Sequence, residues 1–82
     1  MSEKFDLDKQ IGQKIKEARL EFGYSQTNLA DVLGFESPTA VSLIESGNRS
    51  LKIRDLIILC QLFMKDYDYF ISQPDKYRKI KI

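Results

Sequence analysis

Residues 25–49 read SQTNLADVLGFESPTAVSLIESGNR, and this stretch decides the fold. Its first part is a short apolar pattern with helical spacing, which Ser25 can cap at its start and Gly34 can end in a left-handed conformation. Its second part opens with Ser37 as a cap and Pro38, whose fixed φ angle suits the first turn of a helix. The stretch therefore predicts two short helices joined by a tight turn, over residues 26–33 and 38–46.

The residues on both sides of this stretch also carry helical patterns. Before it, apolar residues recur in steps of three and four over residues 7–22, and Gly23 can end that helix. After it, a similar pattern covers residues 53–64, and a short one over 67–71 follows Asp66, which can cap it. No β-hairpin signal and no internal repeat occur, so the sequence predicts an all-α protein with five helices.

A polar tail follows the last of these patterns, so we expect one domain over residues 1–72 and a basic C-terminal tail over 73–82. The tail has an excess of three positive charges, since Lys76, Arg78, Lys79 and Lys81 stand against Asp75. Three interpretations stay open: a solvated chain end, a contact to the DNA backbone, or a strand that pairs with a second protomer.

The composition limits the class of protein. The chain has 82 residues with a formal net charge of +1, from 13 Lys and Arg and 12 Asp and Glu, and 43% of its residues are hydrophobic. This is typical of one small folded domain, and a nucleic-acid surface would have to come from the distribution of charge. The N-terminal residues lack an apolar run and the longest apolar stretch is too short for a bilayer, so we expect a cytoplasmic protein without membrane contact.

The sequence carries no pattern typical of an enzyme or a metal site. It has no histidine and only one cysteine, which excludes a disulfide framework and a Cys/His zinc site. It has no glycine-rich phosphate loop and no nucleophile motif. Cys60 lies on an apolar helical pattern with Leu56 and Phe63, which predicts packing rather than catalysis. We therefore expect no enzymatic activity, no cofactor and no metal.

Four stretches together resemble one known family, the phage-repressor (Cro-like, XRE-type) helix-turn-helix regulators. They are IGQKIKEAR (11–19), FGYSQTNLADVLG (22–34), AVSLIESGNRS (40–50) and DYDYFI (66–71). The resemblance implies a compact five-helix, lambda-repressor-like DNA-binding domain. It implies a sequence-specific transcriptional regulator, most often a repressor, whose third helix, about 38–46, enters the major groove of double-stranded DNA. One departure is an extra residue in the turn GFESPT, which is expected to turn Phe35 toward the core.

The resemblance also assigns roles to individual residues. Thr39, Ser42 and Leu43 match the base-facing positions of the third helix, with Pro38 beside them. Gln26 matches a phosphate contact, and its place at a helix start suits an anion because free N–H groups gather there. The phosphate-contacting set comprises Gln26, Thr27, Ser37, Ser46, Asn48, Arg49 and Lys52. The base-facing set holds no Arg, Asn or Gln, so we expect modest direct readout and a contribution from DNA shape.

Two charged residues have a structural role in the family that this chain resembles. Arg19 and Glu45 match positions that form a partly buried ion pair between the first and third helices. We expect this pair to orient the third helix. The alternative is two solvated surface charges.

The fourth helix favours contact with another protein chain. Ile57, Ile58 and Leu62 are more apolar than one core needs, and Tyr67 and Tyr69 are close in sequence. This favours a homodimer, which reading two half-sites of DNA requires, and the alternative is a wider core.

Two other functions fit the same fold. The first is an antitoxin or protein-interaction module that neutralises a partner protein, which the near-zero net charge favours. The second is a controller protein of a restriction–modification system, which the chain length favours.

Overall fold

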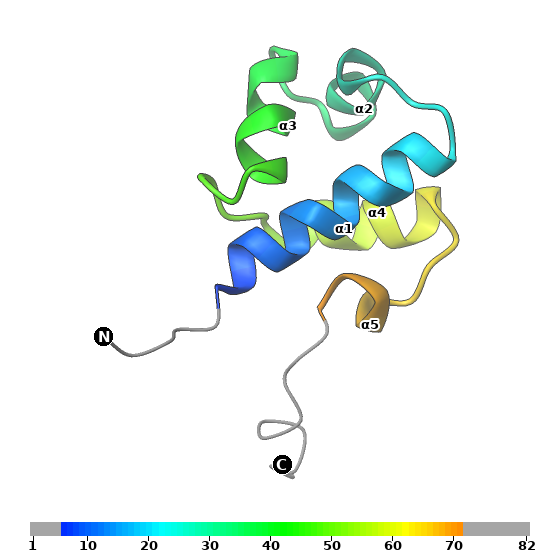
Figure 1. Cartoon of the computed structure of the whole chain (residues 1–82). Coiled ribbons are helices and arrows are strands. Elements are labelled where there is room, and N and C mark those ends of the chain that lie inside the picture. Colours follow the sequence, from blue (N-terminus) through cyan, green and yellow to red (C-terminus); the bar gives the residue numbers. More distant parts are fainter. Residues whose placement is uncertain (1–5, 72–82) are drawn as a thin grey trace, which may run out of the picture.

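The structure, a computed structural model, describes residues 6–71, and this part of the chain contains five α-helices (Figure 1). In chain order they are α1 (Leu7–Glu21), α2 (Gln26–Leu33), α3 (Pro38–Glu45), α4 (Ile53–Leu62) and α5 (Tyr67–Phe70). No strand occurs within residues 6–71, so the predicted all-α class is confirmed. The tail at 73–82 and its three interpretations lie outside the described residues.

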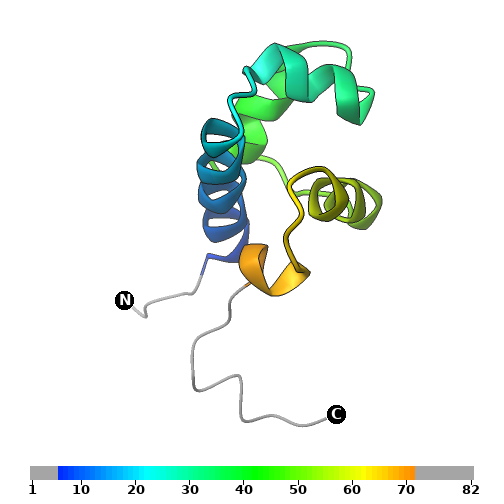
Figure 2. The same cartoon turned by 90° about the vertical axis from the view of Figure 1, so that its right-hand side faces the viewer.

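The five helices occupy the two ends of the molecule and a middle layer between them. Helices α2 and α3 lie together at one end of the molecule and α5 lies at the other, with α1 and α4 between them (Figures 1 and 2). None of the helices within residues 6–71 has the length and apolar character needed to cross a membrane.

The helix starts depend on side-chain caps in two cases, α1 and α2, and on the backbone in the other three. Asp6 accepts the N–H of Lys9 at 3.1 Å. Ser25 forms a full capping box, because its Oγ accepts the Asn28 N–H at 2.9 Å and the Asn28 Oδ1 accepts the Ser25 N–H at 3.2 Å. The predicted side-chain caps from Ser37 and Asp66 are wrong, since each residue accepts through its backbone carbonyl only.

The helix ends agree with the predicted ones to within two residues. Gly34 ends α2 with a φ angle of 76°, a conformation that glycine adopts without a steric cost. The predicted end of α4 at Met64 is two residues too late. Met64 itself has a φ angle of 53°, so the chain leaves the helix before it reaches this residue.

One hydrophobic core joins all five helices. Phe63 and Phe70 are fully buried in it, and Tyr24 contacts the Phe63 ring edge-on at 5.7 Å between centroids. Phe35 packs against the core from the α2–α3 turn, as the sequence predicts. The buried apolar residues are Ile11, Ile15, Ala18, Leu29, Ala30, Leu33, Val41, Ile44, Leu56, Leu59, Phe63 and Phe70.

Helices α1 and α3 approach each other closely at Gly12. A Cβ atom at this position would overlap the carbonyl oxygen of Ile44 and would lie 2.6 Å from that of Glu45. Only a residue without a side chain allows this backbone contact. Gly12 therefore sets how near α3 lies to the first helix.

The outer face of α4 differs from the predicted one. Ile58 and Leu62, which the sequence assigned to a surplus apolar face, are partly buried against the core. The exposed apolar residues are instead Ile53, at 71% exposure, and Ile57, at 54%, together with Tyr67 of α5, at 63%. An exposed apolar surface is therefore present on α4 and α5, and of its members the sequence identified Ile57 and Tyr67 but not Ile53.

Candidate DNA-binding surface

A buried ion pair joins α1 to α3 beneath the candidate surface. The Arg19 Nε lies 2.6 Å from the Glu45 Oε2, and Arg19 Nη2 donates to the other carboxylate oxygen at 3.3 Å. Both side chains are more than 90% buried. Arg19 Nη1 also donates to the Tyr24 carbonyl at 2.9 Å. The pair expected from the sequence is thus present, and its hydrogen bonds offset part of the cost of removing two charges from water.

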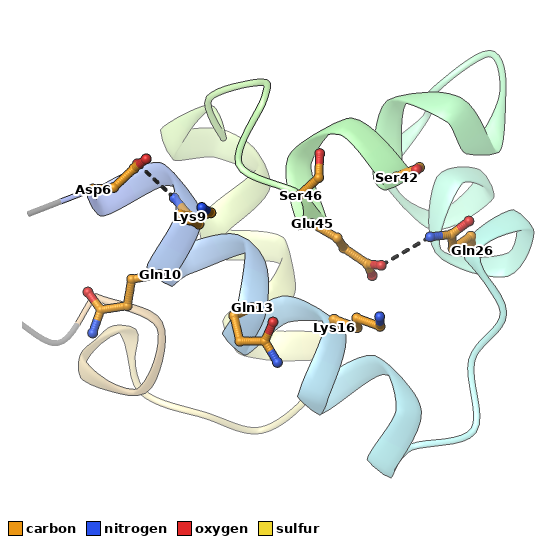
Figure 3. Close-up of a pocket in the computed structure, with 9 residues that line it drawn as sticks. All are labelled: Asp6, Lys9, Gln10, Gln13, Lys16, Gln26, Ser42, Glu45 and Ser46. Carbon is orange, nitrogen blue, oxygen red and sulfur yellow. Dashed lines mark hydrogen bonds between the residues drawn. The ribbon is translucent and has the colours of Figure 1, made fainter.

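Gln26 connects the start of α2 to this ion pair. Its Nε2 donates to the Glu45 Oε1 at 3.1 Å, so the carboxylate holds α1, α2 and α3 in one arrangement (Figure 3). The α-helical pattern leaves the N–H groups of Gln26 and Thr27 without an intrahelical acceptor. The start of α2 therefore offers donors to an anion even while the Gln26 side chain is engaged.

The two faces of α3 separate as its amphipathic pattern requires. Val41 and Ile44 are buried. The opposite face is exposed and comprises Pro38, Thr39, Ser42, Leu43 and Ser46. It presents hydroxyl groups, one leucine and no carboxylate. The structure thus brings together the four residues that the sequence assigned to base reading.

The end of α3 is fixed by a local hydrogen-bond chain. Ser46 Oγ donates to the Leu43 carbonyl at 3.0 Å, and Asn48 Nδ2 donates to Ser46 Oγ at 2.9 Å. Both side chains are exposed, as is Arg49 in the turn that follows. The side-chain carbonyl oxygen of Asn48 and the guanidinium of Arg49 therefore lie at the outer surface of this turn.

Two hollows flank α3. The first, of about 650 Å³, lies between α1 and α3 and includes Gln26 at the start of α2 (Figure 3). The second, of about 430 Å³, lies on the other flank, where the Arg49 guanidinium is 5.4 Å from the centre of the Phe35 ring. Ser37, Thr39 and Leu43 line this second hollow.

The predicted phosphate-contacting residues are thus divided between several places. Gln26 and Ser46 line the first hollow, and Ser37 and Arg49 line the second. Thr27, Asn48 and Lys52 are exposed but line neither hollow. Helix α3 therefore has candidate phosphate contacts on both flanks.

Three exposed residues of α1 that line the first hollow were not predicted from the sequence, namely Lys9, Gln13 and Lys16. Their spacing of four and three places them on one helix face, and this signal was present in the sequence. This spacing alone does not show that α3 lies across from that face, which only the structure shows.

Cys60 lies apart from this surface, at an apolar hollow between α4 and α5. Partial burial raises the pKa of its thiol, and the nearby Asp66 carboxylate raises this pKa further. A raised pKa keeps the thiol protonated and weakly nucleophilic at neutral pH. The environment therefore agrees with a packing role.

The sequence of this chain is similar to that of helix-turn-helix proteins. The sequence profile of the helix-turn-helix family matches residues 15–70. The HTH-type transcriptional regulator RamB of Mycobacterium tuberculosis is 34% identical over 65 residues, which are 79% of this chain. They are 14% of RamB, so the chain spans about a seventh of the length of that relative.

Three solved structures share the fold. The restriction–modification controller protein C.AhdI from Aeromonas hydrophila has a TM-score of 0.67 and 27% identity over 80% of this chain and 97% of its own. The DNA-binding domain of BldD has a TM-score of 0.68 at 18% identity, covering 85% of this chain and all of its own. The clp gene regulator ClgR from C. glutamicum has a TM-score of 0.67 at 22% identity, covering 79% and 82%. The chain therefore belongs to the helix-turn-helix family of DNA-binding transcriptional regulators.

Proposed function

We propose that this protein represses transcription by binding an operator in double-stranded DNA as a homodimer, with α3 in the major groove. The observation that carries the proposal is the exposed face of α3, which lies between two hollows with candidate phosphate contacts on opposite flanks. A major groove is bordered by a phosphate backbone on each side, so such an arrangement suits its shape. Repression then follows from occlusion of a promoter, and the proposed location is the cytoplasm.

The proposed contacts divide into two classes. Pro38, Thr39, Ser42 and Leu43 face the bases, where hydroxyls can donate or accept and Leu43 can contact a thymine methyl. Seven polar residues around α3, four of them in the flanking hollows, contact phosphates and set affinity rather than sequence preference. They are Gln26, Thr27, Ser37, Ser46, Asn48, Arg49 and Lys52.

A direct test titrates the protein against a DNA fragment from upstream of its own gene and against an unrelated fragment, at several salt concentrations. We expect tighter binding to the upstream fragment and affinity that falls steeply with salt, because phosphate contacts release counterions. Binding that does not depend on salt, or no binding to either fragment, would contradict the proposal.

The homodimer rests on a separate surface, which we call the α4–α5 hollow. It has a volume of about 510 Å³ and is lined mainly by apolar side chains, among them Ile53, Ile57 and Tyr67. Lys65 and Asp66 also line it, so two copies related by a twofold axis can oppose unlike charges across the interface. A twofold dimer also places two α3 helices at half-sites about 34 Å apart.

Ile57→Glu tests this interface. A charge in the middle of an apolar contact should convert the dimer into a monomer and weaken operator binding, as measured by sedimentation and by titration. Leu20→Glu is the matched control, because Leu20 is 59% exposed on α1 and Ile57 is 54% exposed. Leu20 does not line the α4–α5 hollow. A wild-type monomer, or equal effects of both variants, would rule out this interface.

A controller protein is the second candidate function. The observation in its favour is the likeness to C.AhdI, which extends over 97% of that chain. Transcription from the upstream promoter with increasing protein distinguishes the two: a decrease alone supports a repressor, and an increase at any concentration supports a controller. The comparisons do not favour the antitoxin interpretation, since the similar proteins are regulators by name.

A further inference from the structure

Helix α1 presents a polar and basic face that the proposed contacts leave unused. Lys9, Gln13 and Lys16 are exposed and lie on one side of the helix. All three line the first hollow, opposite Ser42 and Ser46 of α3 (Figure 3). The hollow therefore has one wall from the first helix and one from the recognition helix.

The charges in this hollow favour an anion. Two carboxylates line it, and both are engaged: Asp6 accepts the Lys9 N–H at 3.1 Å, and Glu45 is neutralised by Arg19. Lys9 and Lys16, by contrast, form no ion pair with any other residue in the part of the chain that the structure describes. Their two ammonium groups outnumber the one carboxylate that lacks a cationic partner.

A third lysine of α1 shows that the lysine charges unpaired within the described residues lie on only one face of the helix. Lys14 lies 3.8 Å from the Glu17 carboxylate and 5.2 Å from the centre of the Tyr69 ring, toward α5. Its charge is thus engaged away from the hollow. Lys14 and Lys16 lie two residues apart on α1, but only Lys16 lines the hollow. They therefore form a matched pair of positions for testing it.

We propose that the hollow between α1 and α3 receives the phosphate backbone of the DNA strand that borders the major groove on the flank opposite Arg49. Helix α1 is then a second phosphate-binding wall, with Lys9 and Lys16 as its cationic contacts. The two lysines are separated by seven residues, or about 10.5 Å along the helix axis, so they reach different phosphates. This inference rests on the proposed entry of α3 into the major groove.

The experiment compares Lys16→Gln with Lys14→Gln in the full chain. Each variant removes one positive charge from α1, and thermal melting checks that both remain folded. Affinity is measured on the upstream fragment and on the unrelated fragment over a range of salt concentrations. We expect Lys16→Gln to lower the salt slope by about 0.9, which corresponds to about eightfold weaker binding near 0.1 M salt. The loss should be the same on both fragments, because phosphates carry no sequence.

The double variant Lys9→Gln/Lys16→Gln should lower the slope by about 1.8, and Lys14→Gln should leave it unchanged. Equal slopes for Lys16→Gln, Lys14→Gln and the wild type would overturn the inference while leaving the proposed function intact. A loss confined to the upstream fragment would also overturn it, since Lys16 would then read a base. If the wild type itself binds neither fragment, the proposed function fails, and the inference fails with it.

Discussion

The α2–α3 end of this small protein and the outer surface of α4 and α5, which we call the α4–α5 end, both expose side chains that the core does not use, but with opposite chemistry. The α2–α3 end presents hydroxyls, amides and cations around Thr39 and Ser42. The α4–α5 end presents Ile53, Ile57 and Tyr67. A polar surface recognises through the direction of its hydrogen bonds, so it must be held still. An apolar surface gains energy from area alone and tolerates small shifts.

The interiors beneath the two ends reflect this difference. Under the α2–α3 end, the Arg19–Glu45 pair is buried, and Gln26 and the Tyr24 carbonyl complete its hydrogen bonds. At the α4–α5 end the corresponding ion pair, between Lys65 and Glu21, is 3.4 Å long, and the Glu21 side chain is exposed. Geometry is thus fixed at the surface proposed to read DNA and is less constrained at the surface proposed to pack against a second copy.

The largest expected effect comes from breaking the buried pair. Arg19→Ala leaves the Glu45 carboxylate buried without a cation and should lower the free energy of unfolding by about 3–5 kcal/mol. Glu21→Gln removes the exposed pair at the other end and should cost about 0–1 kcal/mol. Urea unfolding of both variants measures the difference. A cost below about 1 kcal/mol for Arg19→Ala would mean that the two pairs are equivalent, and the contrast between the ends would not hold.

The next effect concerns affinity rather than stability. Arg49→Ala, at the α2–α3 end, should weaken binding to all DNA sequences alike and lower the salt slope by about 0.9. Lys14→Ala removes a positive charge beside α5, where the Lys14 ammonium lies 5.2 Å from the centre of the Tyr69 ring, and should leave the slope unchanged. Titrations on the upstream and unrelated fragments provide the measurement. If Arg49→Ala altered the preference at one base pair, Arg49 would belong with the base-reading residues instead.

Much of the α2–α3 end could be predicted from sequence because its signals are local. Ser25 and Gly34 mark the ends of α2, Ser25 through a local side-chain hydrogen bond and Gly34 through its backbone conformation, and neither needs a tertiary contact. The ion pair between Arg19 and Glu45 was predicted from the resemblance to a family, because residue spacing alone cannot pair two positions that are 26 residues apart. Phe35 turned toward the core as expected from the longer turn.

The α4–α5 end was less predictable because its helix is apolar on more than one side. Periodicity identifies α4, but it cannot decide whether Ile57 or Ile58 faces the core when both are isoleucine. That choice depends on how α4 packs against α1 and α5, which is set by contacts distant in sequence. The face formed by Lys9, Gln13 and Lys16 was missed for the same reason, because its partner wall lies on α3.

The smallest expected effect tests whether the exposed face of α3, at the α2–α3 end, also distinguishes between DNA sequences. Ser42→Ala removes a single hydroxyl from the exposed face of α3, and one neutral hydrogen bond is worth about 0.5–1.5 kcal/mol. We therefore expect a change in preference of about two- to twelvefold at one base pair, with stability unchanged, because this side chain supports no part of the core. Competition among operator fragments that differ at single positions measures this preference. Thr27→Ala is the control, since Thr27 is exposed on α2 and is proposed to contact phosphate only. A uniform loss for Ser42→Ala, equal on every fragment, would mean that hydroxyls on α3 position the helix, and that the sequence preference of this protein depends on the shape of the DNA.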